Sequence, residues 1–179
     1  DWYKDAKFGI FIHWGVCAVP AWAPKGQYAE WYWNRMGGVE GHNDNPTWDY
    51  HVKVWGEHFP YHAFAPMFKA QMFDPQQWAH IFKEGGAKYV VLTSKHHDGF
   101  CLWPSKEANK SWGRPWNSVD IGPKRDLLGD LGQAVRDAGL RMGFYYSLYE
   151  WFNPIWLTDR QVYVEKHMIC LLYTSPSPR

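Results

Sequence analysis

Three short clusters of polar side chains in this sequence can hydrogen-bond a small polar ligand. His13 follows one apolar run, His96 and His97 follow a second, and Tyr145 lies near the end of a third. Neutral imidazoles and phenols both donate and accept hydrogen bonds, so together they suit a ligand with several hydroxyl groups. We therefore expect a pocket for such a ligand at these residues. The candidates for its apolar wall are Trp14, Trp22, Trp31 and Trp103.

The run His96-His97-Asp98 also has the donor set of a metal site, because two imidazoles and a carboxylate can bind iron or zinc. Adjacent residues of a strand point to opposite faces, so one ion reaches both imidazoles only where the strand has already ended. Two other carboxylates, Glu30 and Glu150, precede tryptophans. Each is either an acid among aromatic rings or part of ordinary packing, and for Glu150 we favour the structural role.

The composition favours a sugar ligand over a nucleic acid. The 179 residues include 13 Trp, 11 Tyr and 10 Phe, and rings with polar edges suit sugar or base stacking at concave surfaces. Because 19 basic residues balance 18 acidic ones, the chain lacks the basic excess of a nucleic-acid-binding protein. No run approaches the roughly 18 apolar residues of a membrane span, so we expect no membrane insertion.

Three apolar strands separated by helices must position the polar clusters. One helix is expected from Asp74, followed by a proline, to Gly85, and the spacing of leucines predicts another from Asp126 to Gly139. Apolar strands that alternate with amphipathic helices predict a parallel sheet covered by helices. The strands are expected over residues 8–12, 88–95 and 141–147.

Such an α/β chain forms either a (β/α)8 barrel or an open doubly wound sheet. We favour the barrel, because no glycine-rich phosphate loop follows the first strand, and we expect no cofactor and no resident metal. Long connections follow the first two strands, where loops of about 2–6 residues are usual. In a barrel this is the face that carries the chemistry, so the three polar clusters should line one pocket.

Five segments occur in a fixed order along the chain: 7–15 (KFGIFIHWG), 28–32 (YAEWY), 93–100 (TSKHHDGF), 116–118 (WNS) and 122–126 (GPKRD). In sequence and order they resemble the amino-terminal half of α-L-fucosidase catalytic domains, a family of retaining glycoside hydrolases. The similarity runs from about Trp2 to about Met168, and residues 146–154 are most similar to the animal lysosomal-type branch.

The resemblance implies a TIM-type (β/α)8 barrel, of which about the first three βα units are present here. It also implies removal of terminal α-L-fucose from fucosylated glycans or glycoproteins by double displacement between two carboxylates. In the family the nucleophilic Asp ends the fourth strand, so we expect no catalytic residue within this chain and no activity of the chain alone. Matched residue by residue, the family contacts fucose at His13, Glu30, Trp31, His96, His97 and Tyr145.

On this interpretation residues 1–169 are an amino-terminal fragment of the catalytic barrel. Residues 170–179 are expected to be a non-native tail, because two prolines there break the helical pattern. A signal peptide is expected before Asp1, with a lysosomal or secreted location, and homo-oligomer formation by the full-length protein is left open. Three βα units alone are expected to aggregate or to form a molten state.

Two alternatives stay open at this point. A non-catalytic fucose-binding or sugar-binding fragment would use the same aromatic and imidazole side chains without chemistry. A metal-dependent barrel hydrolase would instead use His96, His97 and Asp98 as ligands.

Overall fold

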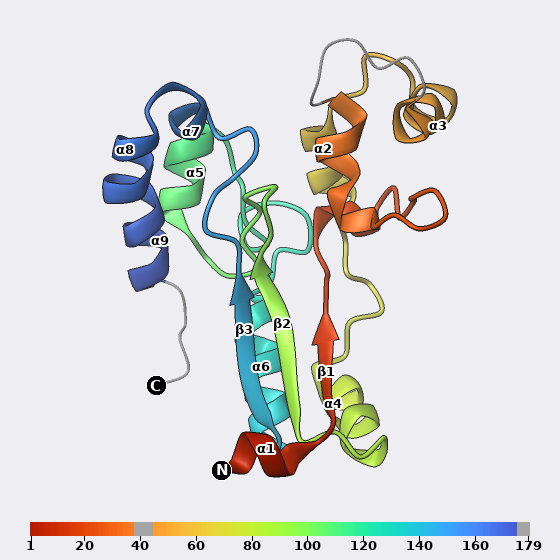
Figure 1. Ribbon diagram of the computed structural model, residues 1–179, viewed down its shortest axis with the longest axis vertical. Helices are drawn as coiled ribbons and strands as arrows, with labels where there is room; N and C mark the ends of the chain where they lie inside the picture. The colour runs from red at the N-terminus through yellow and green to blue at the C-terminus, as the bar shows by residue number, and fades with distance from the viewer. Residues whose placement is uncertain (38–44, 175–179) are drawn as a thin grey trace.

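A parallel three-stranded sheet lies at the centre of the computed structural model, which describes residues 1–37 and 45–174 (Figure 1). The strands are β1 (Gly9–Ile12), β2 (Tyr89–Lys95) and β3 (Arg141–Tyr146), in the order β1-β2-β3. In this register Ile12 pairs with Leu92, which in turn pairs with Phe144. The prediction of three parallel strands is therefore confirmed, and the ends of neighbouring strands lie side by side.

Helices α4 (Pro75–Glu84) and α6 (Leu127–Asp137) contact each other, and α6 packs behind β2 and β3 (Figure 1). Each helix begins at a capping carboxylate. Asp74 accepts a hydrogen bond from the backbone N–H of Gln77 at 2.9 Å, and Asp126 accepts one from that of Gly129 at 2.8 Å. These side chains satisfy N–H groups that have no partner within the helix, which is why the helices start where the sequence predicts.

The remaining elements, apart from α1, lie in the segments that follow the strands, and most of them gather beyond the strands' carboxyl ends (Figure 1). No helix among the described residues is long and apolar enough to cross a membrane. After β1 come η1 (Val16–Ala18), η2 (Ala29–Trp31), α2 (Tyr32–Gly37), α3 (Pro46–Trp55) and η3 (Tyr61–Met67). Helix α5 (Lys106–Trp112) follows β2, whereas α7 (Pro154–Thr158), α8 (Arg160–Val162), the π-helical η4 (Tyr163–Met168) and α9 (Ile169–Thr174) follow β3. Helix α1 (Trp2–Ala6) precedes β1 and lies at the amino ends of the strands.

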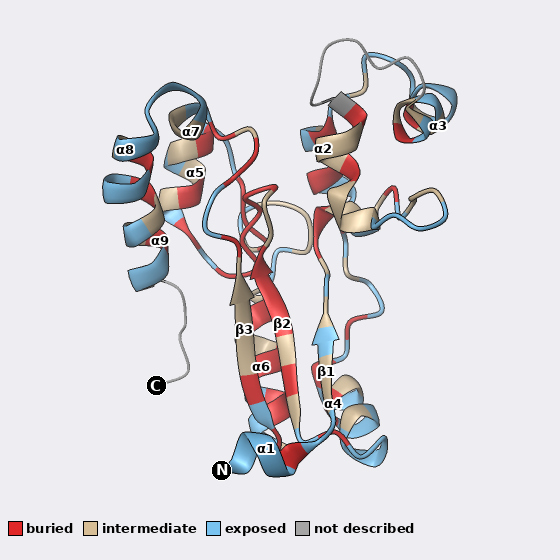
Figure 2. Ribbon diagram, viewed as in Figure 1, coloured by how far each residue is buried: buried red, intermediate tan, exposed pale blue. Residues whose placement is uncertain are grey.

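The two faces of the sheet differ in burial (Figure 2). Val90 and Leu92 of β2 are fully buried in the same core as leucines of α6. Phe11 of β1 pairs with Val91, whose side chain points to the face opposite Val90 and Leu92. Phe11 is 51% exposed. One face of the sheet therefore carries the core, whereas on the other face Phe11 is exposed and Val91 is half-buried, and Thr93 is buried again near the strand end.

The last helix extends into the segment that was expected to be a non-native tail. Helix α9 continues from Ile169 through Thr174, and Leu171 is fully buried in the core. Apolar packing against the rest of the molecule extends the helix past Cys170, and the two prolines expected to break it, Pro176 and Pro178, lie outside the described residues.

Candidate active site

The carboxyl ends of the three strands bring His13, His96 and Tyr145 together. The ring centroids of His13 and His96 are 5.5 Å apart, and that of Tyr145 lies 6.0 Å from His13 and 6.3 Å from His96. Because each strand pairs in parallel with its neighbour, residues at successive strand ends become neighbours in space. The convergence expected from the strand pattern is present.

An aromatic wall adjoins these rings on the side of His97. The indole of Trp151 stacks on the imidazole of His97 with centroids 5.2 Å apart and planes 25° apart, and lies 5.5 Å from the ring of His96. Trp31 packs against Trp151 at 4.9 Å. Trp31 was a candidate for this wall, but the sequence pattern did not single out Trp151, whose only signal is its place shortly after the third strand.

Glu30 lies beside the same imidazoles. Its neighbours around a small cavity of about 10 Å³ include His13, Thr93, His96 and Asp98. A cavity of that volume has room for about one water molecule. The six residues matched to sugar contacts therefore lie around one region at the strand ends.

Two of the imidazoles have defined protonation states. Burial, helped by the nearby His97, His13 and Lys95, lowers the pKa of His96 to about 3. Burial also lowers the pKa of His97, although its hydrogen bond to the carbonyl oxygen of Tyr149 opposes the shift. That bond is 2.8 Å long and places the proton of the neutral ring on Nδ1, which leaves Nε2 as an acceptor.

Asp98 does not join the imidazoles in a metal site. Its Oδ2 accepts a hydrogen bond from the hydroxyl of Tyr61 at 2.9 Å, and its Oδ1 accepts one from the backbone N–H of Phe100 at 3.1 Å. Burial raises the pKa of Asp98 to about 6 against these two hydrogen bonds. Over residues 1–37 and 45–174, no three His, Cys, Asp or Glu side chains are placed to hold one ion. The geometry gives the metal-dependent alternative no support.

Of the four tryptophans expected to wall the pocket, Trp31 alone contacts a histidine of the cluster. Trp103 is 1% exposed and belongs to the core. Trp22 stacks on Tyr50 instead, with ring centroids 4.4 Å apart and planes 3° apart. These two assignments to the wall were wrong.

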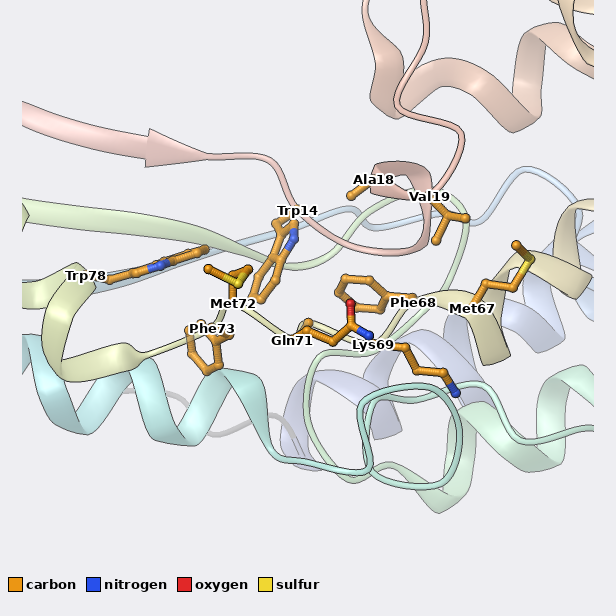
Figure 3. Close-up of a pocket in the computed structure, with 11 residues that line it drawn as sticks. Trp14, Ala18, Val19, Met67, Phe68, Lys69, Gln71, Met72, Phe73 and Trp78 are labelled. Carbon is orange, nitrogen blue, oxygen red and sulfur yellow. The ribbon is translucent and has the colours of Figure 1, made fainter. Parts of the chain in front are cut away.

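Trp14 lines the small cavity beside His13 and His96, but most of its ring contacts lie elsewhere. Its indole packs against Phe68, Phe73 and Trp78, at 5.3, 5.2 and 5.0 Å. These four rings line a separate hollow of about 500 Å³ (Figure 3). That hollow is mainly apolar along its walls and holds none of the residues at the strand ends other than Trp14 itself.

The fold and the cluster together define an α/β protein with hydrogen-bonding imidazoles and an aromatic wall at the carboxyl ends of a parallel sheet, where parallel α/β barrels carry their active sites. The family model described as Alpha-L-fucosidase matches residues 1–169. The chain belongs to the α-L-fucosidase family.

Individual relatives agree with this assignment. The chain is 47% identical over 173 residues to an α-L-fucosidase of Dictyostelium discoideum, covering 92% of this chain and 36% of that protein. It is 47% identical to the tissue α-L-fucosidase of Homo sapiens over 161 residues, covering 89% of this chain and 32% of the relative. The crystal structure of Thermotoga maritima α-fucosidase in complex with fucose superposes with a TM-score of 0.75 at 54% identity, covering 84% of this chain and 35% of that one. The chain thus spans about a third of the length of the curated relatives it matches.

Proposed function

We propose that this chain is the amino-terminal part of the catalytic (β/α)8 barrel of an α-L-fucosidase, and that the whole protein removes terminal α-L-fucose from fucosylated glycans or glycoproteins. The observation that carries the proposal is the convergence of His13, His96 and Tyr145 at three neighbouring strand ends. Membership of the fucosidase family supports the choice of sugar.

The chemistry of the cluster suits fucose. Neutral imidazoles can donate and accept hydrogen bonds toward vicinal hydroxyls, and burial keeps His96 in that neutral form. Trp31 and Trp151 offer an apolar surface to the C6 methyl group that distinguishes fucose from common hexoses. The residues proposed to contact the sugar are His13, Glu30, Trp31, His96, His97 and Tyr145.

We propose a retaining double displacement, in which one carboxylate attacks the anomeric carbon and a second protonates the leaving oxygen. The buried carboxylates of the described residues, Asp98 and Glu150, are each engaged by hydrogen-bond donors, which disfavours either as the attacking group. As the family resemblance implies, we place the nucleophile in a part of the whole protein that follows these three βα units. Residues 170–179 remain proposed as a non-native tail.

The experiment is hydrolysis of an aryl α-L-fucoside by the full-length protein and by the 179-residue chain, each with a His96→Ala counterpart. We expect turnover by the full-length protein, its loss in the variant, and none from the 179-residue chain. Proton NMR of the first-formed fucose should show the α anomer, which reports retention. Hydrolysis by the short chain that disappears with His96→Ala would overturn the placement of the nucleophile. No hydrolysis by the full-length protein would overturn the activity itself.

The location of the whole protein is proposed as lysosomal or secreted. Relatives of Homo sapiens at 47% and 44% identity are named tissue and plasma α-L-fucosidase. Immunofluorescence of cells that express the full-length protein, together with assay of their medium, distinguishes these two locations from the cytosol.

A further inference from the structure

The carboxylate of Glu150 is fully buried, and four side chains donate to it or lie within hydrogen-bond distance of it. Oε1 accepts from Nζ of Lys95 at 2.7 Å and lies 3.2 Å from Nε2 of His167. Oε2 accepts from Nε1 of Trp112 at 2.8 Å and from Nδ2 of Asn153 at 2.7 Å. A carboxylate offers about four acceptor positions, so this one is fully engaged.

These partners come from separate parts of the fold. Lys95 is the last residue of β2, Trp112 ends α5, and His167 lies in η4. Asn153 caps α7, where its Oδ1 accepts from the backbone N–H of Ile155 at 2.9 Å. Glu150 therefore ties the end of β2 to three helical segments that pack above the sheet.

The chain segments that contain Lys95 and Glu150 also carry rings of the candidate sugar site. His96 follows Lys95 directly, and Trp151 follows Glu150 directly. The backbone N–H of Trp151 donates to the carbonyl oxygen of His97 at 2.9 Å. The imidazole of His97 donates in turn to the carbonyl oxygen of Tyr149, so the backbone on both sides of Glu150 holds His97.

We propose that Glu150 is a positioning residue of the fucose site, which fixes His96, His97 and Trp151 through its ion pair with Lys95 and through the backbone on either side of it. The assignment rests on the proposed function. Glu150 itself is fully buried and is not among the residues that line the cavity beside His13 and His96, so it acts by holding two chain segments in register. Sequence position alone favours a structural role for this residue, and the contacts add a link to the site.

The electrostatics agree with this role. Burial alone would raise the pKa of Glu150, but the charge of Lys95 and the hydrogen bond from His167 outweigh it and lower that pKa below its ordinary value. The carboxylate therefore stays ionised at acidic pH, whereas a general acid needs a pKa near the working pH. Lys95 is 1% exposed, so removal of the carboxylate leaves a buried ammonium group without its counter-charge.

The test uses the full-length protein with Glu150→Gln, and with Glu165→Gln as the matched control. Glu165 lies in the same η4 segment as His167 but is exposed, and its Oε1 accepts a hydrogen bond from Gln161. For each variant we would measure kcat, KM for an aryl α-L-fucoside and the inhibition constant of free L-fucose, on protein whose near-UV circular dichroism is native.

We expect Glu150→Gln to raise KM and the inhibition constant of L-fucose by about tenfold or more, because small displacements of positioning groups carry such costs. Glu165→Gln should leave both constants unchanged. A role confined to stability would reduce the folded fraction but leave both constants of the folded protein as in the wild type, and that result overturns the proposal. Absence of hydrolysis by the wild-type protein would instead count against the proposed function.

Should Glu150→Gln fail to fold, Trp112→Phe decides the matter. It removes the hydrogen bond from Nε1 to Oε2 and keeps a smaller aromatic ring against Trp33 and Trp116. We expect about a threefold increase in the inhibition constant of L-fucose, since one of several donors is lost. An unchanged constant in folded Trp112→Phe protein would overturn the positioning role.

Discussion

His13 and His96 lie edge to face, with ring centroids 5.5 Å apart and planes 71° apart, at the ends of two parallel strands. Their proximity follows from the pairing of β1 with β2, in which Ile12 lies beside Leu92. Two imidazoles so close together cannot both carry a proton without repulsion. Burial is the main reason that His96 stays neutral, and the neighbouring His97 and His13 add to that effect.

We predict that His96 stays neutral far below the ordinary histidine pKa. Burial, together with the charges of neighbouring groups, lowers its pKa to about 3. A 15N NMR titration of the full-length protein, with the signal assigned by loss in His96→Gln, should show no protonation of this ring between about pH 8 and pH 4.5. A midpoint near pH 6.5 would contradict the burial of this imidazole.

The same shift predicts a loss of stability in acid. Because the pKa of His96 is lower in the folded state than in the unfolded state, the unfolded chain binds the proton first as pH falls from about 6.5 toward 3. The free energy of unfolding should fall over this range, and less steeply in His96→Gln. Equal slopes for the two proteins in urea unfolding at several pH values would argue against this.

Asp98→Asn should have an effect that depends on pH in the opposite sense. Burial raises the pKa of Asp98 to about 6, so the folded state keeps the proton between about pH 4 and pH 6 after the unfolded chain has lost it. Its contribution to stability is present below about pH 4 and is lost as pH rises through 6. The variant, which has no charge to bury, should therefore gain stability relative to the wild type as pH rises from 4 to 7. A difference in melting temperature that does not change with pH would rule this out.

Gly99→Ala should destabilise the protein much more than Gly113→Ala. Both glycines have left-handed backbone angles, with φ values of +75° and +63°. A Cβ atom at position 99 would lie 2.6 Å from Nε1 of Trp112 and 2.7 Å from Oε2 of Glu150, whereas one at position 113 meets nothing within 4 Å. Both variants bear the cost of a left-handed alanine, roughly 1 kcal/mol, and Gly99→Ala adds about 1–3 kcal/mol of overpacking.

Urea unfolding of the two full-length variants measures that difference. Because Gly113→Ala supplies the backbone cost alone, the excess in Gly99→Ala reports the crowding around Glu150. Equal midpoints would show that the contacts of Gly99 with Trp112 and Glu150 do not constrain this part of the fold.

The features that the sequence predicts correctly depend on local patterns. Asp74 and Asp126 cap helices because a carboxylate there reaches N–H groups three residues ahead, and this spacing is visible in one dimension. The parallel order of the strands follows from apolar runs that alternate with helices. The grouping of His13, His96 and Tyr145 follows from that order.

The features that it does not predict depend on contacts between distant segments. Nothing near Lys95 in sequence indicates that its partner is Glu150, because the pair forms only once β3 lies beside β2. The burial of Trp103 and the stacking of Trp151 on His97 are of the same kind. An aromatic residue at a strand end is equally suited to a sugar or to the core until the loops around it are placed.

The central claim, that the strand ends form a fucose site, is tested most directly by a crystal structure of the full-length protein with L-fucose. We predict a single sugar whose hydroxyls lie within hydrogen-bond distance of His13, His96, His97 and Tyr145. Its methyl group should contact Trp31 or Trp151 within about 4 Å. Fucose bound elsewhere, with no sugar in contact with any of these six side chains, would contradict the account.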